Sequence, residues 1–434
     1  MKCTTIDEVT SSAASVADYS SLVELLRFRA LHRADDTAYI FVADDCEPKR
    51  TLTYGELDRL ARCIAAKIQA DYAPGERALL LYPSGLDFIM GFFGCLYAGV
   101  VAVPATAPRA KRSAEKLQRM VEDLDARMVL TTVAQKSDIE GRMSDFGWGG
   151  VLEVVASDEL TEGETKWREI SPDRDTLAFI QYTSGSSGDP KGVMVSHGNI
   201  LHNELTMDSM FGRNPASMMV SWLPLFHDMG LICSVLQPLC IGYPSVMFSQ
   251  AAFIQRPLMW LQLISEYGAT TSGGPNFAYE HCIDKISDDE KADLDLSSWV
   301  VAINGAEPVR AETLERFAVA FESCGFRREA FSPCYGMAES TLAISGRDGL
   351  TVPRTLGVSG DGLRCEVAAD DCVQETVSCG HAWFETKILI VDPESRSSCP
   401  DGQVAEIWTA GPSVAQGYWN RPQETEETFG AYLA

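Results

Sequence analysis

Residues 182–192 read Tyr-Thr-Ser-Gly-Ser-Ser-Gly-Asp-Pro-Lys-Gly, a stretch dense in glycine and hydroxyl groups. Its glycines let a backbone come close to a ligand, and Lys191 adds a positive charge. Four side chains in it can donate hydrogen bonds through hydroxyl groups: Thr183, Ser184, Ser186 and Ser187. Closely spaced donors, glycines and a lysine are the chemistry of a phosphate cradle. The stretch therefore predicts a phosphate-binding loop.

This loop differs from the Walker A type. That motif has Gly directly before its Lys and Ser or Thr directly after it, whereas here Pro190 precedes Lys191 and Gly192 follows. The flanking stretches 177–182 and 193–196 are apolar and predict two strands, so the loop opens no helix and lacks a helix dipole. A Gly/Ser hairpin without a ligand is the alternative, but it would rarely place a lysine among so many hydroxyls.

Helical and strand patterns alternate on both sides of the loop. Leu57, Leu60, Ala61, Ile64 and Ile68 share one helical face, and a buried strand follows at 79–82. The same sequence of patterns recurs around 117–131, 257–271 and 299–325. This rhythm predicts a layered α/β fold with largely parallel sheets. The pattern differs near the carboxyl end, where 387–392 and 404–408 predict two strands around a turn. These strands predict a small β-subdomain.

The composition of the 434 residues narrows the function classes. The formal net charge is 36 − 61 = −25, so we expect no nucleic acid and no anionic lipid as partner. No signal peptide is apparent, and a long uncharged run, 16 residues between Asp87 and Pro104, is too short and too rich in glycine to span a bilayer. Thirteen scattered cysteines without a Cys-x-x-Cys pair indicate free thiols, and hence a cytoplasmic protein without stable membrane insertion.

The loop resembles the signature of the adenylate-forming superfamily, and further motifs agree with it in chain order. They include Thr53-Tyr-Gly-Glu-Leu57 and the stretch 402–419. Three others resemble the fatty acyl-AMP ligases: Ser221-Trp-Leu-Pro-Leu-Phe-His-Asp-Met-Gly230, Asn304-Gly-Ala-Glu-Pro308 and Ser332-Pro-Cys-Tyr-Gly-Met-Ala-Glu-Ser-Thr341. The resemblance covers about residues 20–430. It implies an αβαβα core of two related subdomains, at 1–170 and 171–341, followed by a β-barrel-like subdomain at 342–434.

The resemblance also implies an ATP site. The loop residues Thr183, Ser184, Gly185, Ser186, Ser187, Gly188 and Lys191 would hold the phosphates. The predicted strand 299–303 leads into Gly305, Ala306, Glu307 and Pro308, at the end of a strand where open α/β sheets bind nucleotides. By resemblance this segment packs on the adenine, and Tyr335, Gly336, Met337 and Ala338 cover its other face. A plain strand-to-helix turn at Pro308 is compatible with this role.

Three residues are expected to take part in the reaction: Lys191, His227 and Glu339. Glu339 matches the family's Mg²⁺ ligand, and Thr183 is a second candidate ligand through its hydroxyl. The alternative for Glu339 is a surface carboxylate at a helix start. The resemblance places His227 where the acyl tunnel meets the phosphates, although a lone His in an apolar stretch is often a core residue. Candidates for the acyl channel, each of which could equally be core, are Trp222, Met229, Gly274, Pro275, Asn276, Phe277 and Met337.

Two expectations concern the end of the chain. Residues 346–378 predict a family-specific insertion, or else a tolerated surface excursion. The superfamily's ribose-binding Asp and its mobile lysine-bearing C-terminal domain follow a Thr-Gly-Asp motif, and the chain ends at Tyr432-Leu433-Ala434 before any such motif. We therefore expect that domain to be absent.

These observations predict that the protein activates a fatty acid with ATP and Mg²⁺ as acyl-AMP. Pyrophosphate is released, and an acyl carrier protein of a polyketide, nonribosomal peptide or lipid pathway accepts the acyl group. A long-chain acyl-CoA synthetase is the nearest alternative, and a non-catalytic adenylate-binding module is the second. A hydrolase is disfavoured because the chain has no Gly-x-Ser-x-Gly elbow.

Overall fold

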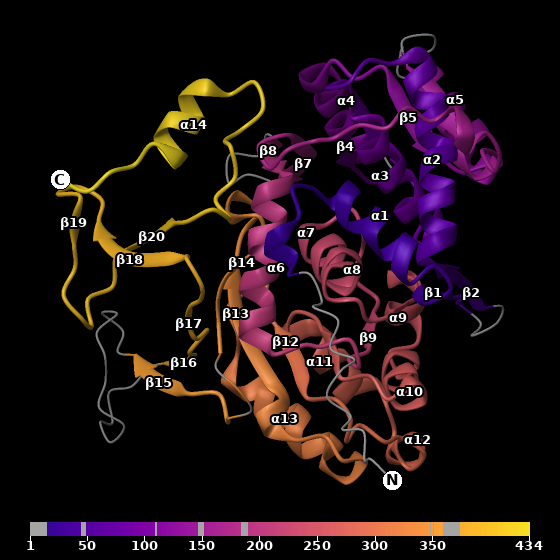
Figure 1. The fold of residues 1–434 in the computed structure, drawn as a ribbon. Helices are drawn as coiled ribbons and strands as arrows, with labels where there is room; N and C mark the ends of the chain where they lie inside the picture. Colours follow the sequence, from indigo (N-terminus) through magenta and orange to yellow (C-terminus); the bar gives the residue numbers. More distant parts are fainter. Residues whose placement is uncertain are drawn as a thin grey trace, which may run out of the picture.

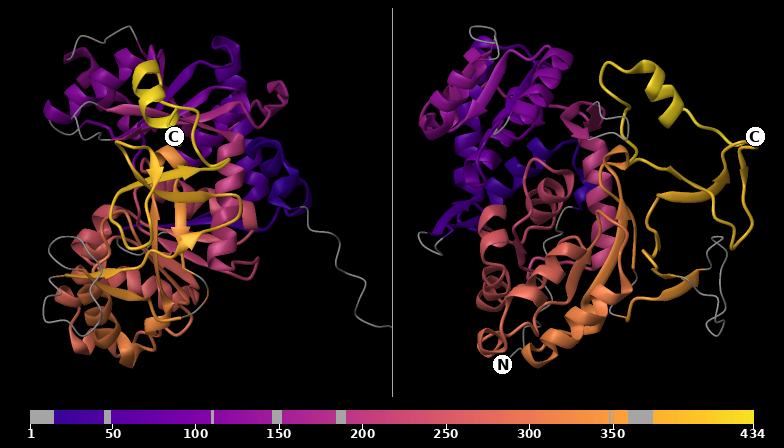
Figure 2. Two further views of the ribbon diagram at one scale, coloured as in Figure 1. Left: turned by 90° about the vertical axis from the view of Figure 1, so that its left-hand side faces the viewer. Right: turned by 180° about the vertical axis from the view of Figure 1, so that it is seen from behind.

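The computed structural model describes residues 15–44, 49–108, 111–145, 152–183, 190–347, 349, 351–358 and 374–434. Two helix-covered sheets form the body of the molecule, and a smaller β-subdomain that contains the carboxyl end lies beside them (Figure 1). The views in Figure 2 show this subdomain on one side of the body. The layered α/β fold expected from the alternating patterns is confirmed.

The first sheet has six strands in the order β6-β5-β3-β4-β7-β8. All neighbours are parallel except β7 and β8, which form an antiparallel pair. Its strands are β3 (Arg77–Leu80), β4 (Val101–Pro104), β5 (Met128–Thr131), β6 (Glu153–Ala156), β7 (Leu177–Thr183) and β8 (Lys191–Ser196). Its helices are α2 (Tyr54–Asp71), α3 (Leu86–Ala98), α4 (Lys111–Leu124) and α5 (Val133–Asp145).

The second sheet has nine strands in the order β17-β14-β13-β12-β11-β9-β10-β1-β2. Its middle strands, from β13 to β1, are parallel. The strands are β1 (Thr37–Val42), β2 (Lys49–Thr53), β9 (Met219–Ser221), β10 (Ser245–Met247), β11 (Thr271–Gly273), β12 (Val301–Asn304), β13 (Phe331–Gly336), β14 (Ala343–Gly346) and β17 (His381–Ala382). The longer helices of this half are α6 (His197–Phe211), α10 (Leu258–Tyr267), α11 (Asn276–Lys285) and α13 (Ala311–Phe321).

The two sheets do not divide at residue 170, which corrects the subdomain boundary expected from the sequence. Strands β1 and β2 belong to the nine-stranded sheet, and β7 and β8 complete the six-stranded one. The chain therefore enters the second sheet, crosses to the first and returns. A local pattern shows that a segment is a strand, but tertiary packing decides which strand it pairs with.

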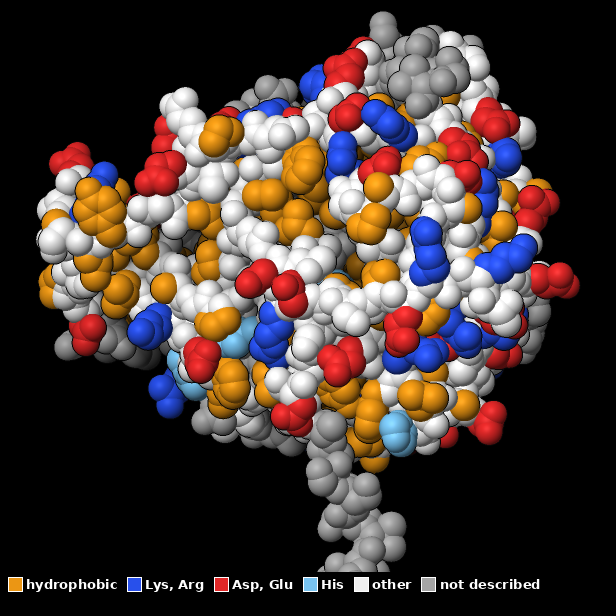
Figure 3. Space-filling view, turned by 45° about the horizontal axis from the view of Figure 1, so that its top comes forward, with side chains coloured by type: hydrophobic (Ala, Val, Ile, Leu, Met, Phe, Trp, Pro, Cys, Tyr) orange, Lys and Arg blue, Asp and Glu red, His pale blue; other side chains and the backbone are white. Residues whose placement is uncertain are grey.

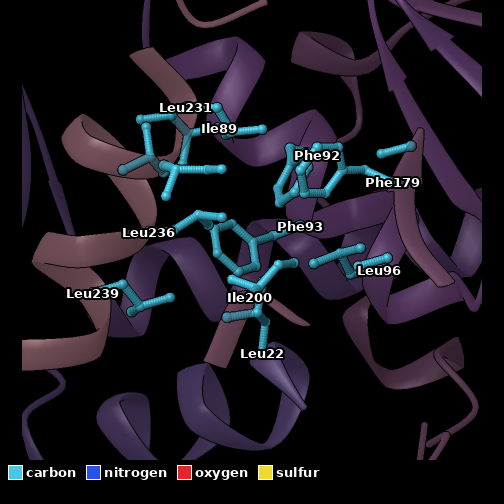
Figure 4. Packing of buried hydrophobic residues seen from close by; sticks show 14 of the residues in the cluster. Leu22, Ile89, Phe92, Phe93, Leu96, Phe179, Ile200, Leu231, Leu236 and Leu239 are labelled. Atoms are coloured by element: carbon cyan, nitrogen blue, oxygen red, sulfur yellow. The ribbon is translucent and has the colours of Figure 1, made fainter. Parts of the chain in front are cut away.

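The largest core lies between the two sheets and is built around α3. Phe92, Phe93 and Leu96 are at most 2% exposed; Phe93 lies beside Leu236 and Ile200 of α6, and Phe92 lies beside Phe179 of β7 (Figure 4). Helix α3 ends at Gly99, whose φ of 76° is left-handed, and β4 begins two residues later. The uncharged run is thus a buried helix followed by a strand, as predicted. Among the described helices, none has the length and apolar character needed to cross a membrane.

The β-subdomain consists of two separate described ladders. Strands β18 (Lys387–Asp392), β19 (Ser397–Ser398) and β20 (Glu406–Ala410) form one, and β15 (Thr355–Val358) and β16 (Gln374–Val377) form the other. Exposed apolar side chains lie on the first ladder and near the carboxyl end, among them Leu389, Ile407 and Tyr432. Hydrophobic side chains are visible on the corresponding lobe at the left of Figure 3. Most of the expected insertion, residues 348, 350 and 359–373, lies outside the described residues.

Candidate active site

The predicted phosphate loop connects two paired strands. Thr183, the last residue of β7, is the register partner of Lys191, the first residue of β8. The strand-to-strand geometry expected from the sequence is therefore present. The residues between the strands, Ser184, Gly185, Ser186, Ser187, Gly188 and Asp189, lie outside the described part of the chain. Their binding of phosphate stays a prediction.

A distant segment, residues 415–421, runs along β8 and completes this edge. The amide of Met194 donates to the Gly417 carbonyl at 2.9 Å, and the amide of Trp419 donates to the Gly192 carbonyl at 2.7 Å. Val193 and Tyr418 thereby form an antiparallel bridge. Pairing with β8 places the Tyr418 side chain beside the base of the loop.

Tyr418 contacts two of the predicted site residues. Its hydroxyl donates a 2.7 Å hydrogen bond to Oε1 of Glu339. The Nζ atom of Lys191 lies 4.9 Å from the centre of its ring, within the range of a cation–π contact. Burial, and in second place this bond to a carboxylate, raise the pKa of Tyr418, so the phenol remains a donor. The role of Tyr418 was not predicted, because it depends on pairing between residues far apart in the sequence.

The segment predicted to contact adenine is shaped by close backbone approaches. A Cβ at position 305 would lie 2.9 Å from Sγ of Cys334, and a Cβ at position 336 would lie 1.9 Å from the Leu342 carbonyl oxygen. At position 336 only glycine fits without movement of the backbone at Leu342, whereas at position 305 a side chain would have to displace the Cys334 thiol. Ala306 follows with a left-handed φ of 67° and is exposed. A non-glycine residue in this conformation stores strain, which is common in ligand-binding turns.

Two cavities meet at His227 and Asp228. One, of about 170 Å³, is lined by those two residues and by Met207, Phe211, Met229, Cys233, Ile303, Ala306, Cys334, Tyr335, Gly336, Leu342 and Ala343. The other, of about 430 Å³, is lined by the same pair and by Pro104, Ala105, Thr106, Lys116, Leu117, Met120, Gln181, Tyr182, Thr183 and Phe226. The first is mainly apolar and includes the adenine segment, whereas the second reaches the end of β7. His227 and Asp228 therefore line both spaces.

Asp228 controls the charge of His227. The Nδ1 atom of His227 and Oδ1 of Asp228 are 2.5 Å apart. Hydrogen bonding to this carboxylate raises the pKa of His227, and partial burial opposes the shift. The Asp228 carboxylate also accepts from the Met229 amide at 2.6 Å, at the start of α7 (Asp228–Leu231). An imidazole that lies between an apolar cavity and a cavity that reaches the end of β7 is placed to donate a hydrogen bond to an acid's carboxylate.

The acyl-channel candidates separate into two groups. Met229 lines the apolar cavity, and Met337 is half-buried with Sδ 4.0 Å from the Tyr335 hydroxyl. By contrast, Trp222 is 1% exposed and its ring stacks on Phe253 at 4.0 Å, so it packs in the core here and its place in the channel stays a prediction.

The stretch 274–277 also lies outside the described cavity lining. A Cβ at position 274 would lie 2.7 Å from the Trp222 ring, and Pro275 follows as the N-cap of α11. Asn276 holds the end of the segment 305–308 through its side chain. This side chain donates to the Pro308 carbonyl at 2.9 Å and accepts from the Arg310 backbone amide at 3.1 Å. The exposed Phe277 donates its amide to Glu307. These four residues position neighbours instead of contacting this cavity.

The donor set around Glu339 fits a magnesium ion shared with substrate phosphates. Magnesium in nucleotide sites usually takes one or two carboxylates plus phosphate oxygens and water. One Glu339 oxygen accepts from Tyr418, and a carboxylate has further lone pairs for a metal. Among the described residues, no group of three or more His, Cys, Asp or Glu side chains could hold a metal ion.

The comparisons with known proteins agree with this geometry. Residues 26–419 match the family model described as AMP-binding enzyme. The chain is 42% identical to a medium-chain-fatty-acid–[acyl-carrier-protein] ligase of Moorena producens, over 97% of this chain and 73% of that protein. It is 34% identical to a long-chain-fatty-acid–AMP ligase of Mycobacterium tuberculosis, over 95% of this chain and 73% of that protein.

A solved structure, the fatty acyl-adenylate ligase of Legionella pneumophila in complex with acyl adenylate and pyrophosphate, superposes with a TM-score of 0.88. It is 41% identical and is matched over 95% of this chain and 72% of that one. The chain belongs to the AMP-binding enzyme family and has the fold of adenylate-forming ligases. The family indicated by the sequence motifs is thus confirmed, and ATP is its substrate.

Proposed function

We propose that this protein joins a fatty acid to the adenylyl group of ATP and releases pyrophosphate. The carboxylate oxygen of the acid forms a bond to the α-phosphorus, and the bond from that phosphorus to the bridging oxygen of pyrophosphate breaks. The observation that carries the proposal is the pair of cavities that meet at His227 and Asp228. One joins the predicted adenine residues Ala306 and Tyr335 to apolar walls for an acyl chain, and the other leads to the phosphate-loop strands.

The residues of the chain divide the work by chemistry. Lys191 and the loop hydroxyls hold the phosphates, and the His227 imidazole orients the acid's carboxylate. The segment 305–308 and Tyr335 enclose the adenine. Glu339, together with Thr183, would hold Mg²⁺, which supplies positive charge that offsets the phosphate oxygens. The relatives named above support this assignment for the reaction and its substrate class.

We further propose an acyl carrier protein as acceptor of the acyl group, because a relative 42% identical to this chain is named for that reaction. The thiolate of the carrier's phosphopantetheine attacks the acyl carbon, a thioester forms, and AMP leaves. The cytoplasmic location expected from the sequence stays a prediction.

Two measurements test the proposed function. In calorimetric titrations, a non-hydrolysable fatty acyl-adenylate should bind at least tenfold more tightly than an aminoacyl-adenylate analogue. With ATP and radiolabelled pyrophosphate, a series of saturated fatty acids should support exchange into ATP. A folded protein that binds no fatty acyl-adenylate would overturn the site. Equal rates of thioester formation with coenzyme A and with carrier protein would overturn the proposed acceptor.

A further inference from the structure

Tyr418 stands between two oppositely charged residues of the site. Lys191 lies over its ring, and Glu339 accepts from its hydroxyl. No ion pair joins Lys191 to Glu339 among the described residues, although both contact the same side chain. One aromatic side chain thus satisfies each charge with a different part of itself.

The orientation of Tyr418 is determined by its surroundings. It is 6% exposed, and its amide donates to Oγ1 of Thr425 at 2.9 Å. Its ring packs edge-on against Phe429 of α14 (Pro422–Phe429), with ring centres 5.2 Å apart. The preceding residue, Gly417, has a φ of 118° that disfavours any side chain. The phenol therefore has little freedom to follow a moving partner.

Glu339 is held by the same segment from two directions. Its carboxylate accepts from Tyr418, and its backbone carbonyl accepts from the Ala415 amide at 2.9 Å. Glu339 lies in a single 3₁₀ turn, η7 (Ala338–Ser340), which offers little support of its own. The segment 415–418 is what ties this turn to strand β8.

We propose that Tyr418 is a positioning residue that holds Glu339 and Lys191 apart and aims both at the metal-bound triphosphate. This inference rests on the proposed roles of Glu339 in metal binding and Lys191 in phosphate binding. Without the phenol, the ammonium and the carboxylate would be drawn to each other, and each would be less available to ATP and Mg²⁺. Tyr418 makes both contacts that achieve this separation: a charge-assisted hydrogen bond to Glu339 and a cation–π contact with Lys191.

Two substitutions separate the contacts. Tyr418→Phe keeps the ring under Lys191 but removes the donor to Glu339. ATP affinity measured calorimetrically in EDTA should therefore stay within about twofold, whereas the Mg²⁺ concentration for half-maximal tightening of ATP binding should rise about tenfold. Tyr418→Leu removes both contacts, so ATP affinity in EDTA should also fall about threefold. Tyr432→Phe is the matched control, because Tyr432 also lies under a cation, Arg396, but is 66% exposed.

A double-mutant cycle tests the separation directly. The effects of Lys191→Ala and Glu339→Gln on the unfolding free energy should be only weakly coupled in the wild-type background, where the two residues contact different parts of Tyr418. In the Tyr418→Leu background the coupling should become larger, because the two charges can then pair. Equal coupling in both backgrounds would overturn the separating role.

The outcomes distinguish this inference from the proposed function. If Glu339→Gln raises the Mg²⁺ requirement and Tyr418→Phe does not, the positioning role is wrong. If Glu339→Gln leaves the requirement unchanged, the metal role of Glu339 fails instead. Should Tyr418→Phe lower the unfolding temperature, Phe429→Leu provides a second route, since it loosens the Tyr418 ring without touching the hydrogen bond. It should raise the Mg²⁺ requirement in the same direction by a smaller factor, and an unchanged requirement would count against the proposal.

Discussion

The hydroxyl of Tyr182 donates a 2.7 Å hydrogen bond to the carboxylate of Asp123. The other oxygen of this carboxylate accepts from the Arg421 guanidinium at 2.8 Å. The backbone carbonyl of Asp123 accepts from the Trp419 indole and from the side-chain amide of Asn420. One residue of α4 thus fastens the strand that leads into the phosphate loop to the segment that contains Tyr418. The end of β7, where the phosphate loop begins, and the segment that holds Glu339 through Tyr418 are therefore connected by hydrogen bonds to Asp123.

Removing the Asp123 carboxylate should loosen this junction. Asp123 is 11% exposed, so Asp123→Ala leaves Tyr182 and Arg421 without their partner and should lower the unfolding free energy by about 2 to 4 kcal/mol. Urea denaturation measures this change. The control is Glu122→Ala, since the adjacent Glu122 is exposed and its described hydrogen bond comes from Gln118, and its effect should stay within about 0.5 kcal/mol. Equal effects of the two variants would contradict the fastening role.

Lys191→Ala should separate ATP binding from folding. The side chain is half-buried and its described contact is the Tyr418 ring, so the unfolding free energy should fall by at most about 1 kcal/mol. ATP affinity in calorimetry should fall about tenfold, because a charge on the phosphates is lost. Lys191→Arg, which retains the charge, should recover part of the affinity. If Lys191→Ala bound ATP as tightly as the wild type, the stretch 182–192 would be better interpreted as a hairpin without a ligand.

The His227–Asp228 pair should make stability depend on pH. Asp228 raises the pKa of His227 above the 6.5 of a free imidazole, so the stabilisation is complete below about pH 6.5 and is lost as the pH rises through the folded-state pKa. Asp228→Asn should therefore destabilise more at pH 5.5 than at pH 9. The difference should be only about 0.5 kcal/mol, because the imidazole is 54% exposed and solvent screens the pair. In a His227→Gln background the effect of Asp228→Asn should be the same at both pH values.

Trp222 and Met229 should respond differently to substitution. Trp222 is packed between Phe253 and Trp260, so Trp222→Phe should lower the unfolding free energy by about 2 kcal/mol and leave the fatty-acid preference unchanged. Met229→Phe places an aromatic ring in the apolar cavity and leaves less room for the acyl chain. It should therefore shift pyrophosphate exchange toward shorter acids. Exchange rates across a series of saturated acids, with urea midpoints for both variants, provide the comparison. A changed chain-length profile in Trp222→Phe would place Trp222 in the channel.

The sequence predicts well what is local. The strand-loop-strand geometry around Lys191 follows from apolar stretches bounded by glycine, and the helical pattern expected at the start of 257–271 is present as α10 (Leu258–Tyr267). Gly336 is a position where the motif has a steric reason, since a Cβ there would lie 1.9 Å from the Leu342 carbonyl oxygen. In each case a few consecutive residues contain the whole cause.

What depends on distant pairing could not be predicted. Tyr418 lies in a stretch that the family resemblance covers, but its contacts with Lys191 and Glu339 arise from its bridge to Val193. The sequence around Trp222 is the same whether the indole lines a channel or packs in a core. Its stacking on Phe253 is seen only in the structure. The assignment of β1 and β2 to the second sheet has the same origin, because a strand's partner is not written in the strand itself.

The interleaving of the two sheets has a consequence for synthesis on the ribosome. Tyr39 of β1 pairs with Ser245 of β10, and 245 − 39 = 206 positions separate them. At about 5 to 20 residues per second, the hairpin of β1 and β2 waits roughly 10 to 40 s for its neighbour. Its outer strand begins with Lys49 and Arg50, charges that discourage pairing with other chains, but the inner edge stays open until β10 emerges. Nascent chains that stall before residue 245 should therefore require a chaperone to remain free of aggregation.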